Sequence, residues 1–255
     1  MADTGGVLKV CLNGARTPAE HPGLPLTPAR LAGSARDAVR AGADAIHLHP
    51  RGADGSESLL AVDVAGAVAA VRAACPGVPV GVSTGLWITA RDPRARLELV
   101  GGWVVLRDAE RPDFASVNLS EPGTAELAGL LHDLGIGVEA GVWTAHDARA
   151  LAPSSTRPAS IRTVLPGLVR VLVEIIGVPP EQAVAEADAV LAALGDPGVP
   201  VLLHGEREAC WPVLRHAAGL GLPTRIGLED VLTGPDGEPV AGNADLVRHA
   251  REIIG

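Results

Sequence analysis

The sequence predicts a (β/α)8 barrel that forms a single domain over residues 1–255. The chain has 255 residues, close to the length of about 250 that is typical of such barrels. Short apolar runs alternate with helical segments along the whole chain. The runs are apolar almost throughout, as in strands that are buried on both faces of a parallel sheet. No linker or low-complexity tract divides the chain, which favours one closed barrel.

The expected strands and helices follow one another in βα order. The strands are expected over residues 7–12, 45–49, 78–83, 115–119, 137–143, 169–175, 199–204 and 224–228. The helices with recognisable boundaries are expected over residues 29–41, 148–160, 181–194 and 244–254. Thr27 is a good N-cap, Pro28 suits the first helical position, and Gly42 ends that helix. Prolines interrupt the periodicity of the segment 148–160.

A doubly wound open sheet is the alternative fold. It would require a glycine-rich phosphate loop after the first strand. The segment Asn13-Gly14-Ala15-Arg16 does not fit that pattern, so the closed barrel is preferred.

Composition and charge exclude several classes of partner. The net charge of −9 argues against non-specific binding of nucleic acid or anionic lipid, which both need a basic surface. No apolar run approaches the roughly 20 residues that span a bilayer, and residues 1–6 lack the features of a signal peptide. The three cysteines are far apart and odd in number. We therefore expect reduced thiols in a cytoplasmic protein with no membrane partner.

The chain contains one lysine, Lys9, and no tyrosine. A Schiff-base mechanism would have to use Lys9, near the start of the first strand. Catalysis in barrels takes place at the opposite end, where the strands finish. Any enolate must therefore be stabilised by a metal or by hydrogen bonds.

The motif Ile46-His47-Leu48-His49-Pro50 ends the second expected strand. Side chains at i and i+2 point to the same face of a strand, so both imidazoles can reach one cation. Pro50 then ends the strand, because proline has no N–H for the ladder. The alternative is a pair of hydrogen-bonded core histidines.

The last expected strand leads into Glu229 and Asp230 and contains Arg225. These charges are costly to bury unless they are paired or bind a metal. Glu229 can complete a site of two histidines and one carboxylate that leaves positions open for water or substrate. Zinc is the expected metal, although iron, cobalt or manganese also suit these ligands. The alternative is a pair of exposed acids that cap the next segment.

Polar residues also occur at the ends of other strands. Ser83 and Thr84 lie at the end of the third strand, where they can bind a substrate carboxylate or simply form a turn. Asn118 and Ser120, at i and i+2 on the fourth strand, can bind the same group. Glu139 is an acid inside an apolar strand and needs a partner. The segment 204–207 after the seventh strand can hold substrate or form an exposed loop.

With these residues in view, the chain resembles the β-keto acid cleavage enzymes over almost its full length. The matching motifs are Leu12-Asn13-Gly14-Ala15, Leu24-Pro25-Leu26-Thr27-Pro28, Ala41-Gly42-Ala43, His47-Leu48-His49-Pro50-Arg51, Asp54-Gly55, Val82-Ser83-Thr84-Gly85, Ser116-Val117-Asn118, Arg225-Ile226-Gly227-Leu228-Glu229-Asp230 and Asn243. The resemblance implies a zinc-dependent (β/α)8 barrel, usually a homo-oligomer. It also implies condensation of a β-keto acid with acetyl-CoA, which gives acetoacetate and a new acyl-CoA.

The resemblance also implies roles for single residues. His47, His49 and Glu229 would bind zinc. Asp230, working with Arg225, would remove the proton alpha to the keto group. Ser83, with Asn118 or Ser120, would hold the substrate's carboxylate and keto oxygens. The remaining expected substrate contacts are Asn13, Arg16, Arg51, Thr84 and Glu139.

The chain departs from the family pattern at three places. Family members commonly carry an acid that recognises a substrate amino group where this chain has Arg16, which suggests an anionic acyl group. The segment after Glu139 lacks a second acid, and the segment 205–207 differs. Two other functions remain open: a metal-dependent carbon–carbon lyase or hydrolase that does not use CoA, and a non-catalytic small-molecule binding protein.

Overall fold

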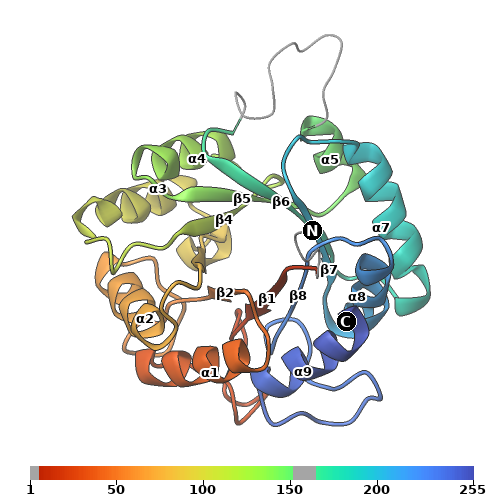
Figure 1. Cartoon of the computed structure of the whole chain (residues 1–255). Coiled ribbons are helices and arrows are strands. Elements are labelled where there is room, and N and C mark those ends of the chain that lie inside the picture. Colours follow the sequence, from red (N-terminus) through yellow and green to blue (C-terminus); the bar gives the residue numbers. More distant parts are fainter. Residues whose placement is uncertain (1–5, 152–164) are drawn as a thin grey trace.

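The computed structural model of the chain is a (β/α)8 barrel, and it describes residues 6–151 and 165–255 (Figure 1). Neighbouring strands pair in parallel, in the order β8, β1, β2 and onward to β7. The strands are β1 (Leu8–Cys11), β2 (Ala45–Leu48), β3 (Val80–Ser83), β4 (Phe114–Asn118), β5 (Gly137–Val142), β6 (Leu168–Ile175), β7 (Val201–Gly205) and β8 (Thr224–Ile226).

Hydrogen bonds between the ends of β7 and β8 close the ring. The Leu203 N–H donates to the Pro223 carbonyl at 2.9 Å. The Thr224 hydroxyl donates to the Leu203 carbonyl at 2.7 Å. The expected closed barrel is therefore confirmed, and the open-sheet alternative is excluded.

Helices form an outer ring around the strands (Figure 1). They are α1 (Pro28–Arg40), α2 (Ala61–Ala74), α3 (Pro93–Gly101), α4 (Thr124–Asp133), α5 (Ala145–Leu151), α7 (Pro180–Leu194), α8 (Cys210–Gly219) and α9 (Asn243–Ile254), with short 3-10 helices η1 (Leu86–Thr89), η2 (Gly102–Val105) and η3 (Arg207–Ala209). The Thr27 hydroxyl caps α1 by accepting from the Arg30 N–H at 3.3 Å, as expected. Fully buried side chains such as Val10, Ile46 and Leu31 belong to the core between strands and helices.

The strands lie where the sequence predicts them, but β3 and β7 begin two residues late and β8 ends two residues early. Gly227 ends it where the chain passes very close to β1, since a Cβ there would lie 1.9 Å from the Cys11 carbonyl oxygen. The expected helix over residues 148–160 lies largely outside the described residues. Its first four residues are the end of α5.

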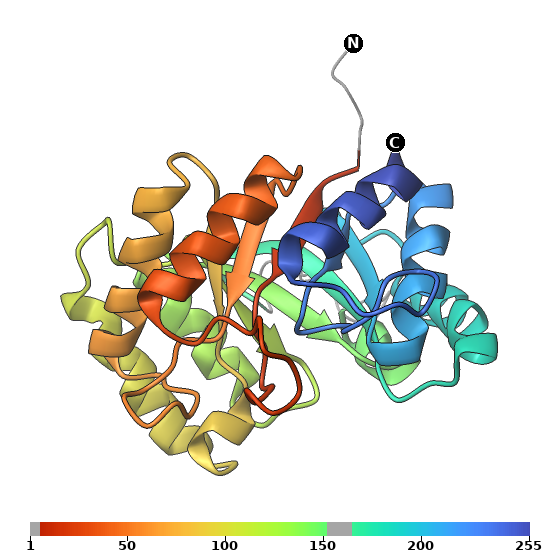
Figure 2. The ribbon, with the colours of Figure 1, turned by 90° about the horizontal axis from the view of Figure 1, so that it is seen from below.

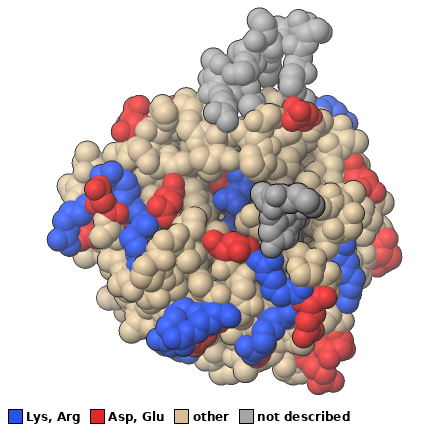
Figure 3. Space-filling model, in the orientation of Figure 1, with Lys and Arg blue, Asp and Glu red and all other residues tan. Residues whose placement is uncertain are grey.

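The two ends of the barrel differ. β1 begins and α9 ends at one end, and the loop after β1 lies at the other (Figure 2). On the face drawn in Figure 3, acidic and basic side chains are interspersed outside the grey atoms, and no single basic surface forms there. The described helices include none with the length and apolar character that crossing a bilayer requires.

Candidate functional site

A cavity of 390 Å³ opens where the strands end. Each of the eight strands, or the segment that follows it, contributes to its wall. This is the end of a barrel at which active sites are built. The lining residues are Ala15, Arg16, Glu20, His47, His49, Ser83, Trp87, Ser116, Asn118, Trp143, Leu172, Glu174, Ile176, Glu206, Arg207, Arg225 and Glu229.

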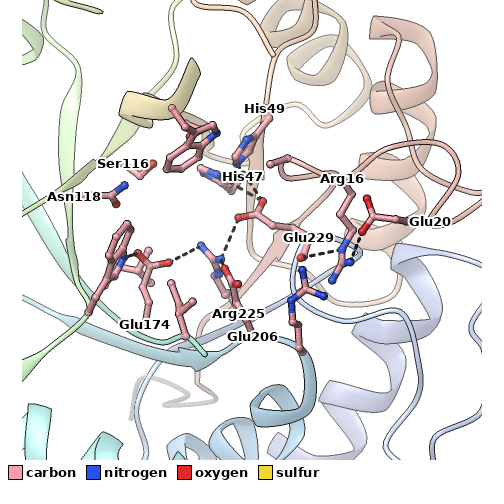
Figure 4. A pocket seen from close by; sticks show the side chains of 17 residues that line it. Arg16, Glu20, His47, His49, Ser116, Asn118, Glu174, Glu206, Arg225 and Glu229 are labelled. Atoms are coloured by element: carbon pink, nitrogen blue, oxygen red, sulfur yellow. Dashed lines mark hydrogen bonds and ion pairs between the residues drawn. The ribbon is translucent and has the colours of Figure 1, made fainter. Parts of the chain in front are cut away.

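His47, His49 and Glu229 converge at the edge of this cavity (Figure 4). The two histidines project to the same face of β2 because they are two residues apart. Glu229 Oε2 lies 3.8 Å from His47 Nε2 and 3.5 Å from His49 Nε2. One ligand atom from each residue lies within 4.8 Å of the others.

The donor set fits a divalent cation. Glu229 Oε2 and His47 Nδ1 are buried and make no hydrogen bond to any described residue, which is costly unless another group binds them. Two imidazoles and one carboxylate leave coordination positions open, as a catalytic metal requires. Cys11, Glu229 and Asp230 are also close together, but burial raises the pKa of the Cys11 thiol well above its usual value, which disfavours the thiolate.

Burial and neighbouring charges prepare His47 and Glu229 to bind a cation, whereas a metal must displace a proton from His49. Burial lowers the pKa of His47 well below its usual value, so its imidazole is neutral and able to coordinate. Burial opposes ionisation of Glu229, but Arg225, His49 and His47 outweigh it and hold the pKa of Glu229 well below normal. Glu229 is therefore a carboxylate, as a metal ligand must be.

Glu57, in the segment between β2 and α2, fixes the orientation of His49. Its Oε1 lies 2.5 Å from His49 Nδ1, and its Oε2 accepts from Trp87 Nε1–H at 2.9 Å. The Trp87 ring stacks on His49, with ring centroids 6.3 Å apart. The hydrogen bond at Nδ1 leaves Nε2 of His49 free to face Glu229. Burial opposes protonation of His49, but Glu229 and Glu57 outweigh it and raise its pKa to about 9.

Arg225 lies at the centre of a cluster of acids (Figure 4). Its guanidinium donates to Asp230 Oδ1 at 2.8 Å from Nη2 and to Glu229 Oε1 at 3.0 Å. Glu174 Oε2 lies 3.5 Å from Nη1, and Glu206 Oε1 lies 4.0 Å from Nη2. Arg225 is 3% exposed, so these contacts are made away from bulk water and are only weakly screened.

Asp230 and Glu206 differ in their access to the cavity. Asp230 is 0% exposed and lies behind the cavity wall, with Oδ2 making no hydrogen bond to described residues. Burial raises its pKa, although Arg225 opposes this. Glu206 lines the cavity, and burial raises its pKa to about 7. The expected proton acceptor is therefore the more enclosed of the two carboxylates.

The wall opposite Arg16 carries small polar groups. Ser83, Ser116 and Asn118 all line the cavity. Ser116 and Asn118 lie two residues apart on β4, so they share its inward face. Ser120 lies past the end of β4, is exposed, and lines a separate outer pocket of 190 Å³. The inward position that was expected for Ser120 belongs to Ser116.

Asn13, Arg51 and Thr84 hold loops in place and do not line the cavity. Asn13 exchanges two hydrogen bonds of 2.9 Å with the backbone of His49. Arg51 donates to the carbonyls of Gly14 and Arg16 and so ties the loop after β1 to the loop after β2. Thr84 donates to the Ser116 carbonyl at 2.5 Å. Because their polar groups are already engaged, these residues support the site from behind.

Glu139 is inside the barrel but away from the cavity wall. It is 0% exposed, and its Oε2 lies 2.5 Å from Lys9 Nζ. Arg170 Nε lies 3.0 Å from the other carboxylate oxygen. Glu139 thus finds the partners that a buried acid requires within the protein, in Lys9 and Arg170.

Sequence patterns did not identify several residues of the site. Glu57 lies in a Gly/Ser-rich loop with no periodicity. Glu174 is enclosed in an apolar strand and bonds to His204 Nε2 at 3.0 Å and to Trp143 Nε1–H at 2.9 Å. An acid inside an apolar run was a usable signal for Glu174, as it was for Glu139. No comparable signal marked Glu57 or Trp87.

A family model described as beta-keto acid cleavage enzyme matches residues 6–255. Among solved structures, apo ObcA has a TM-score of 0.66 and 18% identity, over 91% of this chain and 61% of that chain. ObcA in a ternary complex with a C4-CoA adduct and oxalate has a TM-score of 0.65 and 19% identity, over 91% of this chain and 63% of that chain. The 3-dehydroquinate dehydratase from Geobacillus kaustophilus HTA426 has a TM-score of 0.58 and 11% identity, over 98% of this chain and 91% of that chain. These structures share the fold, and the chain spans less than two thirds of the length of ObcA.

Proposed function

Because the chain belongs to the beta-keto acid cleavage enzyme family, we propose that it is a zinc-dependent enzyme that condenses a β-keto acid with acetyl-CoA and releases acetoacetate and a new acyl-CoA. The observation that carries this proposal is the convergence of His47, His49 and Glu229 in a cavity that also holds Arg225. The complexes of ObcA with oxaloacetate and with a C4-CoA adduct support small keto acid and CoA ligands for a related barrel.

The reaction exchanges the acyl groups that the alpha carbon of the keto acid and the sulfur of CoA carry. Removal of a proton from the carbon between the keto group and the carboxylate gives a carbanion, which attacks the thioester carbonyl. This attack expels the CoA thiolate and leaves both acyl groups on the alpha carbon. The thiolate then attacks the original keto carbonyl, the bond from that carbonyl to the alpha carbon breaks, and the alpha carbon takes a proton to give acetoacetate. A bound zinc ion would supply a Lewis acid that stabilises the enolate form of the keto acid.

The chain's own residues bind and orient the substrate. Ser83, Ser116 and Asn118 supply hydrogen bonds for its carboxylate and keto oxygens on one wall. Arg225 supplies positive charge beside the cluster and favours the negative charge that develops when the proton leaves.

Asp230 is the proposed proton acceptor. Its Oδ1 is held by Arg225, and Oδ2 is the oxygen that remains available for a proton. Arg16 lines the cavity and is the proposed contact for an anionic acyl group, although Glu20 already holds its Nη1 at 2.9 Å.

Metal analysis and turnover, measured together, test the proposal. Wild type is expected to bind about one zinc ion per chain and to form acetoacetate from a panel of β-keto acids with acetyl-CoA. His47→Ala/His49→Ala is expected to lose both metal and activity. His146→Ala replaces an exposed histidine of α5 and is expected to keep both. If wild type contains no metal even after zinc is added, the proposed site is refuted. If it binds zinc but shows no CoA-dependent turnover, a lyase or hydrolase is favoured.

Proton exchange with solvent tests the proton acceptor separately from the whole reaction. Asp230→Asn is expected to retain zinc but to lose exchange of the substrate's alpha protons in deuterated water, followed by NMR. The rate should fall by about 100-fold or more, which is typical of a lost general base. Glu206→Gln should still exchange. If Asp230→Asn still exchanges and Glu206→Gln does not, the proton acceptor is Glu206, which lines the cavity and has a pKa of about 7.

A further inference from the structure

We propose that a groove beside the catalytic cavity binds the phosphate groups of a CoA-type thioester, an assignment that rests on the proposed function. The groove has a volume of 470 Å³. The segment after β7 forms one side of it, and the segment after β8, residues 231–237, forms the other. Arg16 and Arg207 line both the cavity and the groove, so a ligand can extend from one into the other.

The groove is basic in a chain whose net charge is −9. Arg16, Arg207 and Arg215 line it, and Glu208 is the acid among its lining residues. Neither Arg207 nor Arg215 has a carboxylate within 4.0 Å or a side-chain hydrogen bond among the described residues. Both arginines are exposed, so solvent can reach their guanidinium groups and an anion can bind them without breaking an ion pair. A phosphate can accept two parallel hydrogen bonds from each guanidinium.

The backbone holds Arg207 at the junction of cavity and groove in a strained conformation. Its φ is +54°, in the left-handed region that favours glycine, so the conformation is strained for an arginine. The Arg207 N–H donates to the Asp230 carbonyl at 2.7 Å, which fixes this conformation. In this conformation Arg207 lines both the catalytic cavity and the groove.

The groove also occupies a place where barrels bind phosphate. Phosphate sites in this fold commonly form from the segments after the seventh and eighth strands together with the N-terminus of a helix. Here α8 begins at Cys210, at the groove, and its N-cap residue Ala209 provides no side-chain cap. Because η3 runs directly into α8 and the Cys210 N–H donates to the Arg207 carbonyl, the positive end of the joined helix lies at Arg207, where it adds to the charge of the three arginines.

The two sides of the cavity suit different substrates. Arg16 lies on the side of Glu229 that is away from Ser116 and Asn118 (Figure 4). A keto acid held by the small polar groups leaves the Arg16 side open for the second substrate. That substrate must carry a reactive thioester at one end and negative charge at a distance from it. The nucleotide pyrophosphate tail of CoA has this chemistry, whereas a pantetheine thioester lacks the phosphates.

Binding of CoA and of pantetheine, measured by titration calorimetry, tests the assignment. Wild type is expected to prefer CoA. Arg215→Gln, in the groove alone, should reduce the ratio of CoA to pantetheine affinity by about tenfold, as one lost charge-assisted contact predicts. Arg207→Gln should reduce it similarly. Arg40→Gln, which removes an exposed arginine from α1, is the control for net charge and should leave the ratio at the wild-type value.

The outcomes separate this proposal from the proposed function. An Arg215→Gln variant with the wild-type affinity ratio would overturn the groove assignment, even if acetyl-CoA turnover is normal. Absence of keto acid turnover, with CoA binding that Arg215→Gln weakens, would refute the reaction and leave the groove in place. Adenosine 3′,5′-diphosphate is expected to compete with CoA much more strongly than inorganic phosphate does. Equal competition would show a simple anion site and overturn the assignment to a nucleotide tail.

Discussion

Arg225 shows at the scale of one residue why the site needs a second cation. Its guanidinium lies within 4.0 Å of carboxylate oxygens from Glu174, Glu206, Glu229 and Asp230. The charge of Arg225 alone cannot balance four buried or half-buried acids, and the cost of uncompensated charge in such a place is several kcal/mol. A divalent metal at Glu229 removes part of this imbalance. Protonation of Glu206, the acid farthest from Arg225, removes another part.

Glu206 therefore makes stability depend on pH in the metal-free protein. Its pKa is about 7 in the folded protein and 4.5 as an ordinary glutamate, because burial disfavours its charge. The proton on Glu206 therefore stabilises the folded protein fully below pH 4.5. This contribution to the free energy of unfolding is lost as the pH rises through 7, where the folded state releases the proton. Glu206→Gln should thus gain stability over wild type as the pH rises, by about 2 kcal/mol at pH 8 after allowance for partial solvent screening.

Urea unfolding of the metal-free proteins at pH 5 and pH 8 measures this difference. Glu252→Gln, at an exposed position in α9, is the matched control for loss of one carboxylate. A difference between Glu206→Gln and wild type that is the same at both pH values would contradict the raised pKa of Glu206.

At the scale of elements, the segment between β2 and α2 supports His49, the proposed metal ligand that directly follows β2. The chain turns back after Arg51, so that Arg51 and Glu57 pair in an isolated antiparallel bridge and Glu57 lies beside His49. Gly55, at φ +83°, allows this turn. Trp87 of η1 bonds to the same carboxylate from the neighbouring strand–helix unit. Two loops thus determine the position of one imidazole.

Removal of the Glu57 carboxylate is expected to weaken zinc binding without abolishing it. Glu57→Ala should lower zinc affinity by about 10- to 100-fold, the usual effect of losing a carboxylate that orients a metal-bound histidine. Trp87→Phe keeps the ring but loses the N–H, and should have a smaller effect. Competition with a chromophoric chelator measures both affinities. Glu98→Gln, exposed on α3, serves as control, and an affinity of Glu57→Ala equal to that of the control would contradict the orienting role.

The elements were predictable from the sequence to a greater extent than the walls of the cavity. Apolar runs and helix caps identify strands and helices because burial and backbone hydrogen bonds act locally. The His-x-His pair was predictable for the same reason, since a strand alternates its faces. Asn13, Arg51 and Thr84 looked equally suited to substrate, yet they bond to neighbouring loops. Which loop a side chain meets depends on closure of the ring, and the sequence around one strand does not contain that information.

At the scale of the whole molecule, an ion pair crosses the interior of the barrel below the cavity. Lys9 of β1 and Glu139 of β5 are both fully buried, and Arg170 of β6 completes the group. The only lysine of the chain is thus committed to structure, which agrees with its predicted exclusion from imine chemistry. Breaking a buried pair costs more than removing it entirely, because the remaining charge has no compensation.

Single and double substitutions of this pair are expected to be non-additive. Glu139→Leu should lower the free energy of unfolding by about 3–5 kcal/mol, because Lys9 is left buried without its carboxylate. Lys9→Met/Glu139→Leu should be less destabilised than the sum of its single variants. Urea unfolding of the four proteins gives the coupling energy. Strict additivity would show that the two side chains do not interact in solution.

Closure of the ring also determines when during synthesis the metal centre can form. Of the three proposed ligands, two lie on or directly after the second strand, and the third follows the last strand, close to Gly227, where the backbone meets Cys11. A chain still emerging from the ribosome has both histidines but lacks the carboxylate and the arginine beside it. Tight metal uptake is therefore expected as one of the last steps of maturation, and the metal content of a preparation measures the fraction of chains that have completed the barrel.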